Sequence, residues 1–353
     1  MKIAILNDTH CGIRNSSEIF MDYQEKFYRD IFFPFLEEND IDKILHLGDY
    51  YDNRTSINFK ALNHNRRIFL DQLRDRRIHM DIIPGNHDVY YKNTNRLNAL
   101  KELQGHYMGE IRIIEEPTVV DYDGFNVALV PWINPENEEK AVNFIQNCKA
   151  DICAAHLELN GFEMQKGVPC SDGMSPSIFD RFDAVLSGHF HTKSHKENIH
   201  YLGSQMQFFW SDCNDRKYFH VLDTETREIE AVENPVTIFE KLHWDDTNNN
   251  YALKDVSYLD EKFVKLIVVN KTKPAEFEKF VDRINSRKIH GLQIAENFQD
   301  FGGSQVEDEN ISLESTDRLL YSYIDAVDTD LNKDRIKSEV RELMVEAQSL
   351  EHV

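Results

Sequence analysis

Short apolar runs alternate with amphipathic stretches through about the first 235 residues of the chain. The apolar runs predict strands at residues 2–6, 43–47, 79–83, 125–133, 151–156, 183–189 and 200–204. Helices are expected at residues 18–35, 57–76 and 95–103, where apolar residues recur near the 3.6-residue spacing. Strands that alternate with helices in this way predict an α/β domain.

The pattern changes past about residue 236. Residues 262–294 predict a strand, a helix that begins at Pro274, and a second strand. In the last part of the chain, Ile336, Val340, Leu343, Ala347 and Leu350 fall on one helical stripe. We therefore expect a large domain at residues 1–245, a small α+β domain at 246–297, a linker at 298–310 and a helical region at 311–353.

Composition favours a soluble intracellular protein. The 353 residues include 41% hydrophobic residues, and no apolar run approaches the roughly 20 residues that span a bilayer. The five cysteines contain no CxxC pair, which suits a reducing compartment. We therefore expect a cytoplasmic location, in the host cytoplasm if the chain is phage-encoded, and no membrane partner.

The formal net charge of -22 argues against non-specific nucleic-acid binding by the whole surface. Two segments invert the sign locally. Residues 54–77 carry seven basic and two acidic residues, and residues 262–290 carry eight basic and three acidic residues. Contact with a DNA backbone and simple solvation of helix faces are both compatible with these segments.

Polar residues follow most of the early apolar strands. The set consists of Asp8, His10, Asp49, Asn86, His87, His156, His189 and His191. Because loops at the carboxyl ends of parallel strands meet at one edge of a sheet, we expect these side chains to converge. Carboxylates, imidazoles and an amide suit borderline divalent ions such as Mn²⁺, Fe²⁺ or Zn²⁺.

Two histidines lie close together in the stretch Gly188-His189-Phe190-His191. If this stretch is extended, both imidazoles point to the same side, about 7 Å apart. Gly188 would then leave room for the backbone to approach, and Phe190 would face the other way.

Seven of the eight polar residues make two coordination sets if one carboxylate bridges two ions. Two ions about 3.5–4 Å apart can hold a hydroxide and neutralise charge on a phosphoryl group. The eighth residue, His87, is then free to protonate the leaving oxygen. This chemistry predicts hydrolysis of phosphoesters.

The series DTH, GDYYD, PGNHD, AH and GHFH resembles, in order, the motifs of the calcineurin-like metallophosphoesterases. The resemblance implies a two-sheet α/β/β/α sandwich. It also implies one ion on Asp8, His10 and His191, and a second on Asn86, His156 and His189. Asp49 would bridge the two ions, and His87 would be the catalytic histidine.

The stretches between the motifs, including IPGNHDVYYKN, VDYDGFNVALVPW and HLELNGFEMQKG, are similar to nuclease subunits of the SbcD type and their tailed-phage form. This implies 3'-5' exonuclease and single-strand endonuclease activities in recombination and double-strand-break repair, with two divalent ions. Mn²⁺ is expected, and Mg²⁺ is the alternative. The resemblance also implies homodimerisation through the helices between the second and third motifs. The second domain would cap the site and hold DNA, and the C-terminal helices would bind an ABC-type ATPase of the SbcC kind.

Other members of the family fit less well. Protein phosphatases carry GDxVDRG and GNHE, where this chain has GDYYDNR and GNHD, and purple acid phosphatases have a tyrosine at the position of Asp52. A small-molecule phosphodiesterase or nucleotidase of the same fold stays open as an alternative. A metal-binding scaffold without catalysis is a further one, although the complete ligand set argues against it.

Overall fold

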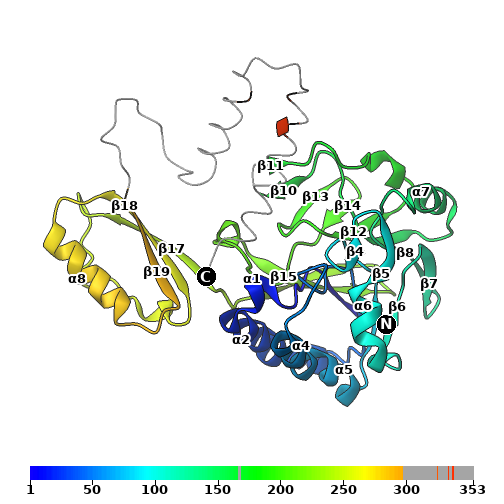
Figure 1. The fold of residues 1–353 in the computed structure, drawn as a ribbon, viewed down its shortest axis with the longest axis horizontal. Helices are drawn as coiled ribbons and strands as arrows, with labels where there is room; N and C mark the ends of the chain where they lie inside the picture. The colour runs from blue at the N-terminus through cyan, green and yellow to red at the C-terminus, as the bar shows by residue number, and fades with distance from the viewer. Residues whose placement is uncertain (166–167, 297–323, 325–332, 334–335, 338–353) are drawn as a thin grey trace. The chain divides into compact units, whose positions relative to one another are not determined.

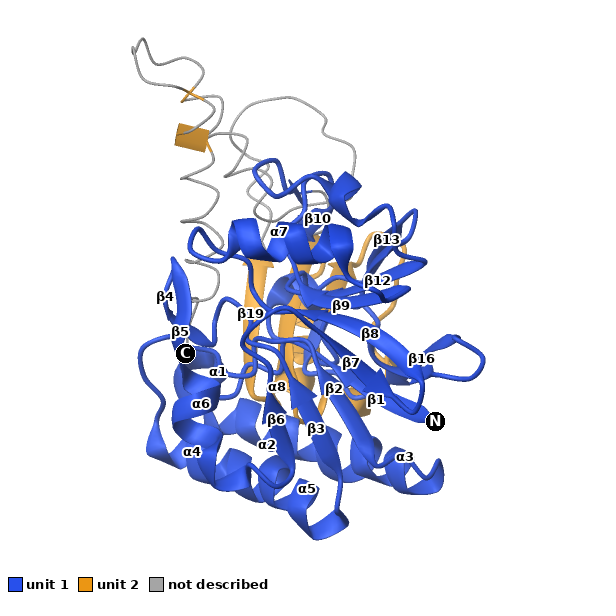
Figure 2. Ribbon diagram, turned by 90° about the vertical axis from the view of Figure 1, so that its right-hand side faces the viewer, with its two compact units in different colours: residues 1–240 blue, residues 241–353 orange. Residues whose placement is uncertain are grey.

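The computed structural model describes residues 1–165 and 168–296, together with Ile324, Lys333, Ile336 and Lys337. The chain divides into two compact units, residues 1–240 and 241–353 (Figure 2). The expected linker and C-terminal helices lie outside the described residues, apart from those four positions. Within the described part, no helix has the length and apolarity to cross a membrane.

Unit 1 contains two six-stranded sheets (Figure 1). The first has the order β16-β15-β1-β2-β3-β6. Its bounds are β1 Lys2–Leu6, β2 Lys43–His46, β3 His79–Ile82, β6 Ile111–Ile113, β15 Lys217–Asp223 and β16 Ile229–Asn234. Strands β1, β2, β3 and β6 run parallel, whereas β15 and β16 are antiparallel to their neighbours. Three of the expected strands therefore form, and their carboxyl ends lie at one edge.

The second sheet has the order β13-β14-β12-β9-β8-β7. Its bounds are β7 Thr118–Tyr122, β8 Phe125–Val130, β9 Ile152–His156, β12 Ala184–Gly188, β13 Ser194–Lys196 and β14 Ile199–Tyr201. Strands β8, β9, β12 and β14 run parallel, and β7 and β13 are antiparallel edge strands. The expected strand at 125–133 ends earlier, at Val130, because the next residue is Pro131, which has no N–H for the ladder.

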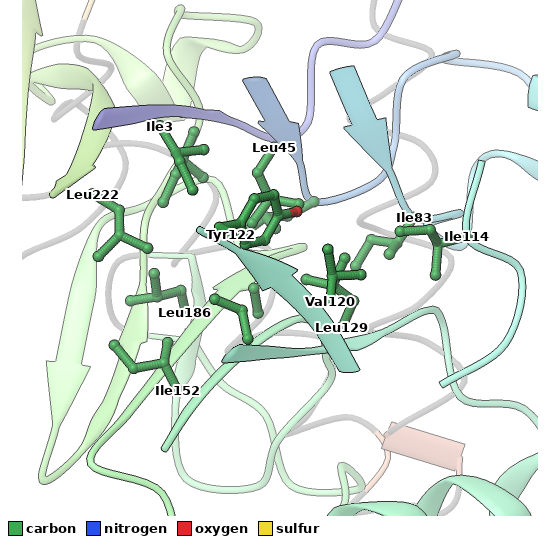
Figure 3. Packing of buried hydrophobic residues seen from close by; sticks show 14 of the residues in the cluster. Ile3, Leu45, Ile83, Ile114, Val120, Tyr122, Leu129, Ile152, Leu186 and Leu222 are labelled. Atoms are coloured by element: carbon green, nitrogen blue, oxygen red, sulfur yellow. The ribbon is translucent and has the colours of Figure 1, made fainter. Parts of the chain in front are cut away.

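An apolar layer separates the two sheets. Side chains from the first sheet, including Ile3, Leu45 and Leu222, lie against Leu129 and Leu186 from the second (Figure 3). Removing one such side chain from water contributes about 1.5–3 kcal/mol. The two sheets therefore form a sandwich held by this shared core, as the family resemblance implied.

Helices cover both outer faces of the sandwich. One face carries α2 Glu18–Phe27 and α3 Phe33–Glu38, joined by a π-helical turn at Tyr28–Phe32. The same face carries α4 Phe59–Asn65 and α5 Asp71–Arg76, joined by a second π-helical turn at Arg66–Leu70. Figures 1 and 2 both place α7 Glu138–Asn147 on the opposite face. The layers are thus α/β/β/α.

Aromatic side chains join the first helical layer to its sheet. The rings of Tyr28 and Phe69, from the two π-helical turns, lie 4.8 Å apart between centroids. Phe32 contacts Phe219 of β15 at 5.2 Å. These contacts fix the two helical segments side by side against β15.

The helix expected at residues 95–103 is wrong in its first part. Residues 94–98 form strand β5 Thr94–Asn98, which pairs with β4 Val89–Tyr91 as a hairpin. Helix α6 Ala99–Gln104 starts only after Asn98, whose side chain accepts a 2.9 Å hydrogen bond from the backbone N–H of Lys101. The extended backbone of this N-cap residue sets the boundary.

Several short elements complete unit 1. They are α1 Ile13–Ser16, η3 Gly105–Tyr107, β10 Glu163–Gln165 paired with β11 Val168–Pro169, η4 Pro176–Phe179 and η5 Trp210–Asp212. The five cysteines are free thiols.

Unit 2 contains a three-stranded sheet of order β17-β18-β19. Its elements are β17 Phe239–Asp245, which starts at the boundary of unit 1, η6 Ser257–Leu259, β18 Phe263–Asn270, α8 Pro274–Asn285 and β19 Gly291–Glu296. Helix α8 buries Phe277 and Phe280 against the fully buried Trp244. The strand, helix and strand therefore follow the predicted order, and Pro274 is the first residue of the helix.

Candidate metal centre

The candidate residues lie at or just after the carboxyl ends of strands from both sheets. Asp8 and His10 follow β1, Asp49 follows β2, and His156 is the last residue of β9. Asp8, His10, Asp49 and His189 all have positive φ angles, of 49°, 46°, 53° and 90°. Non-glycine residues seldom adopt this conformation, and it concentrates where a site needs a particular side-chain direction. The backbone thus bends sharply at half of the eight candidates.

One cluster of ligand atoms comes from Asp8, His10 and His191. The Nε2 atoms of His10 and His191 lie 3.1 Å apart, and His191 Nε2 lies 4.0 Å from Asp8 Oδ1. Two neutral imidazoles that meet through Nε2 share a single hydrogen, whereas a cation accepts lone pairs from both. This donor set of one carboxylate and two imidazoles fits a borderline divalent ion.

A second cluster comes from Asp49, His156 and His189. His156 Nε2 lies 3.3 Å from Asp49 Oδ2 and 3.0 Å from Asn86 Oδ1. The other ring nitrogen of His156, Nδ1, lies 2.7 Å from the carbonyl of Leu47. A proton on Nδ1 satisfies that carbonyl and leaves Nε2 with a free lone pair, as a metal ligand requires.

His87 lies next to the first cluster. Its ring centroid is 5.0 Å from that of His10, and its backbone N–H donates a 2.7 Å hydrogen bond to Asp49 Oδ1. Its Nδ1 lies 2.6 Å from the backbone carbonyl of Asp52. That contact fixes Nδ1 as a donor, so any proton that His87 transfers must leave from Nε2.

The contacts above, with the 5.2 Å separation of the His156 and His189 rings, connect all eight predicted residues. The structure therefore brings the complete predicted set together.

Neighbouring charges divide the histidines into two kinds. Burial opposes a charged His10, but the Asp52 carboxylate, 3.3 Å from its Nδ1, and the charge of Asp49 outweigh burial and raise its pKa to about 9. The pKa of His156 also rises to about 9, because the attraction of Asp49 outweighs burial. Burial, with the positive charge of His156, instead lowers the pKa of His189 to about 3. Each cluster therefore contains one imidazole with a high affinity for protons. This affinity reflects the negative charge of the neighbouring carboxylates.

Two glycines permit the close packing of these loops. A Cβ on Gly85 would lie 2.2 Å from Asp49 Oδ1, and one on Gly188 would lie 2.9 Å from the carbonyl of Leu47. Gly188 thus leaves room for the neighbouring backbone, as predicted. The expectation of an extended stretch is wrong at His189, because its φ of 90° turns the chain just after β12 ends. Phe190 is buried and stacks on Tyr201 at 4.5 Å, in the core rather than the site.

A buried ion-pair network supports the loop that carries His191. Lys217, whose side chain is 2% exposed, lies 2.7 Å from Asp212 and 2.9 Å from Asp215. Its Nζ also donates a 2.9 Å hydrogen bond to the carbonyl of His191. Asp212 in turn accepts hydrogen bonds from the backbone N–H groups of Phe208 and Phe209, at 2.8 Å and 2.9 Å.

Aromatic rings surround the imidazoles. Phe209 stacks on His191 with centroids 5.8 Å apart and an interplanar angle of 14°. Phe208 meets His10 edge-on at 5.6 Å, and Trp132 lies 5.3 Å from His189. These contacts restrict the ring orientations of the candidate ligands.

Asp88 joins the second and third motif loops. Its fully buried carboxylate accepts hydrogen bonds from the backbone N–H groups of Tyr50, Tyr51 and Gly85, at 3.0 Å, 3.0 Å and 2.9 Å. Asp49 and Asn86 are each next to one of these donors in the sequence, so Asp88 holds the two loops that carry them together.

Sequence reasoning missed Asp52, Asp88 and Lys217 as supporting residues. The sequence did contain a signal for Asp52 and Asp88. Each lies inside one of the motifs, and an acidic residue in a ligand loop often orients a neighbouring histidine. Lys217 carries no such signal, since it starts β15, more than twenty residues after the last motif.

Comparison with known proteins identifies the family. The chain matches the calcineurin-like phosphoesterase family over residues 1–193. Exonuclease subunit 1 of Enterobacteria phage T4 is 31% identical over 350 residues, which cover 98% of this chain and 99% of that protein. The chain belongs to the calcineurin-like phosphoesterase family. It is a metallophosphoesterase, and the two clusters contain the residue types that hold divalent ions in such enzymes.

Two further similarities are more distant. The SbcD component of the SbcCD nuclease from Staphylococcus epidermidis is 24% identical over 379 aligned positions, covering 92% of this chain and 99% of that protein. The solved structure of an archaeal phosphodiesterase is 14% identical and covers 66% of this chain and all of that one, with a TM-score of 0.35. A likeness at that score adds nothing to the family assignment.

Proposed function

We propose that this metallophosphoesterase is a DNA nuclease with 3'-5' exonuclease and single-strand endonuclease activities. The arrangement that carries the proposal is the pair of ligand clusters, Asp8/His10/His191 and Asp49/His156/His189, with His87 beside them. Support for DNA as substrate comes from the two relatives, named as an exonuclease subunit and a nuclease subunit, which match nearly the full chain.

The ligand assignment follows the two clusters, with Asn86 added to the second through its contact with His156. Asp8, His10 and His191 would hold one ion, and Asn86, His156 and His189 would hold the other. Asp49 would be shared between the two ions; its Oδ2 lies 3.3 Å from His156 Nε2, and its Oδ1 accepts the N–H of His87. We propose Mn²⁺ as the working ion, since the mixed nitrogen and oxygen donors suit it better than Mg²⁺. When bound, two such ions would polarise the phosphoryl group and lower the pKa of an attacking water.

His87 supplies the proton for the leaving group. As water attacks phosphorus and the phosphorus–oxygen bond to the sugar breaks, His87 donates from Nε2 to the departing oxygen. The carbonyl of Asp52 keeps the ring oriented through Nδ1 during this step. His87 thus combines a fixed orientation with partial exposure to solvent, from which substrate arrives.

The basic segments contribute less to the DNA proposal than their charge suggested. Between helices, Arg67 pairs with Glu25 at 2.6 Å, and Arg76 pairs with Glu37 at 2.7 Å. These pairs join the π-helical turn at Arg66–Leu70 to α2 and join α5 to α3, so part of the charge of residues 54–77 is neutralised within the fold. In unit 2, Arg283 donates to the carbonyls of Tyr251 and Lys254, and Arg287 pairs with Asp260. Part of the positive charge of residues 262–290 is therefore also used within the fold.

We further propose that the enzyme works as a homodimer and with an ABC-type ATPase in recombination and break repair. The relatives named as subunits support a partner. The segment assigned to that partner, residues 311–353, lies almost wholly outside the described residues. Co-purification of a tagged full-length chain with an SbcC-type ATPase, compared with a chain ending at residue 310, tests this assignment.

The decisive experiment compares the wild type with His87→Ala. Linear and single-stranded DNA are incubated with Mn²⁺, and bis-p-nitrophenyl phosphate serves as a small diester. We expect the wild type to degrade DNA, and we expect His87→Ala to lose DNA cleavage by at least about a hundredfold while it still binds Mn²⁺. Hydrolysis of the small ester without any DNA cleavage would instead indicate a small-molecule phosphodiesterase. Full DNA cleavage by a clean His87→Ala preparation would refute the role of His87.

A further inference from the structure

A short hairpin beside His87 exposes two aromatic side chains. Strand β4 begins at Val89, two residues after His87, and its next residues are Tyr90 and Tyr91. These two side chains are 42% and 52% exposed, whereas Val89 is completely buried. Since three residues of chain span at most about 11 Å, Tyr90 lies within roughly that distance of His87 along the backbone.

The two rings lie together although they are neighbours in a strand. Successive side chains of a regular strand point to opposite faces. Here the pairing with β5 is irregular between Val89 and Tyr91, and the rings of Tyr90 and Tyr91 meet at 4.7 Å with an interplanar angle of 74°. Irregularities of this kind re-aim side chains and are common next to active sites. The result is a compact, partly exposed aromatic pair.

The hairpin is fixed to the loops of the metal centre. Asn95 of β5 donates a 2.8 Å hydrogen bond to the carbonyl of Trp132, and its own side-chain oxygen accepts one from Asn134 at 2.8 Å. The ring of Trp132 contacts His189. At the other end of the hairpin, the N–H of Ala99 donates to the carbonyl of Asp88 at 2.7 Å. The aromatic pair is therefore held in a defined position with respect to the candidate ligands.

We propose that Tyr90 and Tyr91 form a nucleobase-stacking subsite for the DNA strand being cleaved. The proposal rests on the nuclease function above and specifies how that site holds its substrate. Aromatic side chains stack on any base, and each such contact strengthens binding without sequence preference. Lys92, exposed at the turn of the same hairpin, offers a cation to the phosphates of that strand. Because bases inside a duplex are stacked on neighbouring bases at both faces, the subsite favours single strands and frayed ends.

The test uses the full-length chain with both tyrosines replaced by alanine, and a matched variant with both replaced by phenylalanine. Each protein is assayed with Mn²⁺ on a single-stranded oligonucleotide, on the same oligonucleotide with abasic nucleotides placed in turn around the scissile phosphate, and on bis-p-nitrophenyl phosphate. Met108→Ala, which removes an exposed apolar side chain elsewhere, is the surface control.

We expect the ratio of kcat/KM for the oligonucleotide to that for the small ester to fall about tenfold in the alanine variant. The phenylalanine variant should keep the wild-type ratio, because its rings still stack. An abasic nucleotide at the contacted position should cost the wild type a similar factor and cost the alanine variant nothing further, since one lost contact cannot be lost twice.

Three results would overturn the subsite. One is an unchanged ratio in the alanine variant of an enzyme that does cleave DNA, which leaves the nuclease function standing. The second is an equal abasic penalty in wild type and variant, which means that the tyrosines do not contact the base. The third is the absence of DNA cleavage by the wild type despite ester hydrolysis, which removes the nuclease function and the subsite together.

Discussion

The ammonium group of Lys217 donates a 2.9 Å hydrogen bond to the backbone carbonyl of His191. The same nitrogen forms ion pairs with Asp212 and Asp215, and all of this takes place in the interior. Burial disfavours the charged lysine, but the two carboxylates outweigh burial and raise its pKa. Lys217 is therefore a buried cation that fixes the backbone of a candidate metal ligand.

Replacing Lys217 with methionine keeps most of the volume and removes the charge. We expect the free energy of unfolding to fall by about 3–5 kcal/mol, because two carboxylates lose their partner in the interior. We also expect weaker binding of the ion assigned to Asp8, His10 and His191. Denaturant unfolding gives the first quantity, and Mn²⁺ titration of the folded variant gives the second.

Arg216→Met, at an exposed neighbouring residue, should change the free energy of unfolding by less than about 0.5 kcal/mol. Wild-type Mn²⁺ affinity in Lys217→Met would show that the network does not position His191.

Metal affinity should rise with pH. With pKa values raised to about 9, His10 and His156 hold protons at neutral pH when no ion is bound, and binding must displace one proton in each cluster. The affinity for Mn²⁺ should therefore increase about tenfold per pH unit between about pH 7 and 9 and then level off.

Calorimetric titrations in buffers of different ionisation enthalpy count the protons released on Mn²⁺ binding. We expect about one proton per ion at pH 7, and the same number in His79→Ala, which removes an exposed histidine outside the site. An affinity that does not change between pH 7 and 9 would mean that His10 and His156 are not the proton-bearing ligands.

The sequence predicted the site more fully than the backbone that presents it. Asp8, Asp49, Asn86 and the histidines entered the predicted set because ligand chemistry restricts the residue types and each follows a recognisable strand, and the structure brings them together. The turn at His189 was missed, because residues spaced two apart suggest an extended chain, and a positive φ in a histidine leaves no mark in the sequence.

The apolar pattern also failed to predict strand β5 at Thr94–Asn98. Apolar spacing in that region fits a helix, but pairing with Val89–Tyr91 and the N-cap at Asn98 override it. The two-sheet arrangement was also beyond the apolar pattern alone. It depends on which strands pair within each sheet and on which faces of the two sheets pack against each other. We expected it only from the family resemblance.

Asp52 should influence metal binding without being an assigned ligand. Its carboxylate lies 3.3 Å from His10 Nδ1, the ring nitrogen on the side away from His191. Removing a partner of this kind typically lowers metal affinity or activity by about 10–100-fold. We expect that loss in Asp52→Ala and a smaller loss in Asp52→Asn, which keeps an oxygen for His10. The main-chain carbonyl that orients His87 stays in both variants. Equal, wild-type Mn²⁺ affinity in both would exclude the carboxylate as a support for His10.

Phe59 provides a direct test of the homodimer. It is the first residue of α4, in the helical segment between the second and third motifs, and its side chain is 85% exposed. In a two-fold dimer built on this segment, two copies of Phe59 would be buried, which contributes about 3–6 kcal/mol in total. Phe59→Asp should therefore raise the dimer dissociation constant at least about a hundredfold, seen by light scattering as the mass of one chain at micromolar protein. Hydrolysis of bis-p-nitrophenyl phosphate should be unchanged, because Phe59 contributes nothing to the metal centre. Met108→Asp, at another exposed apolar residue, is the control. A Phe59→Asp variant that stays dimeric would place the interface on another surface, and a monomeric wild type would refute the homodimer itself.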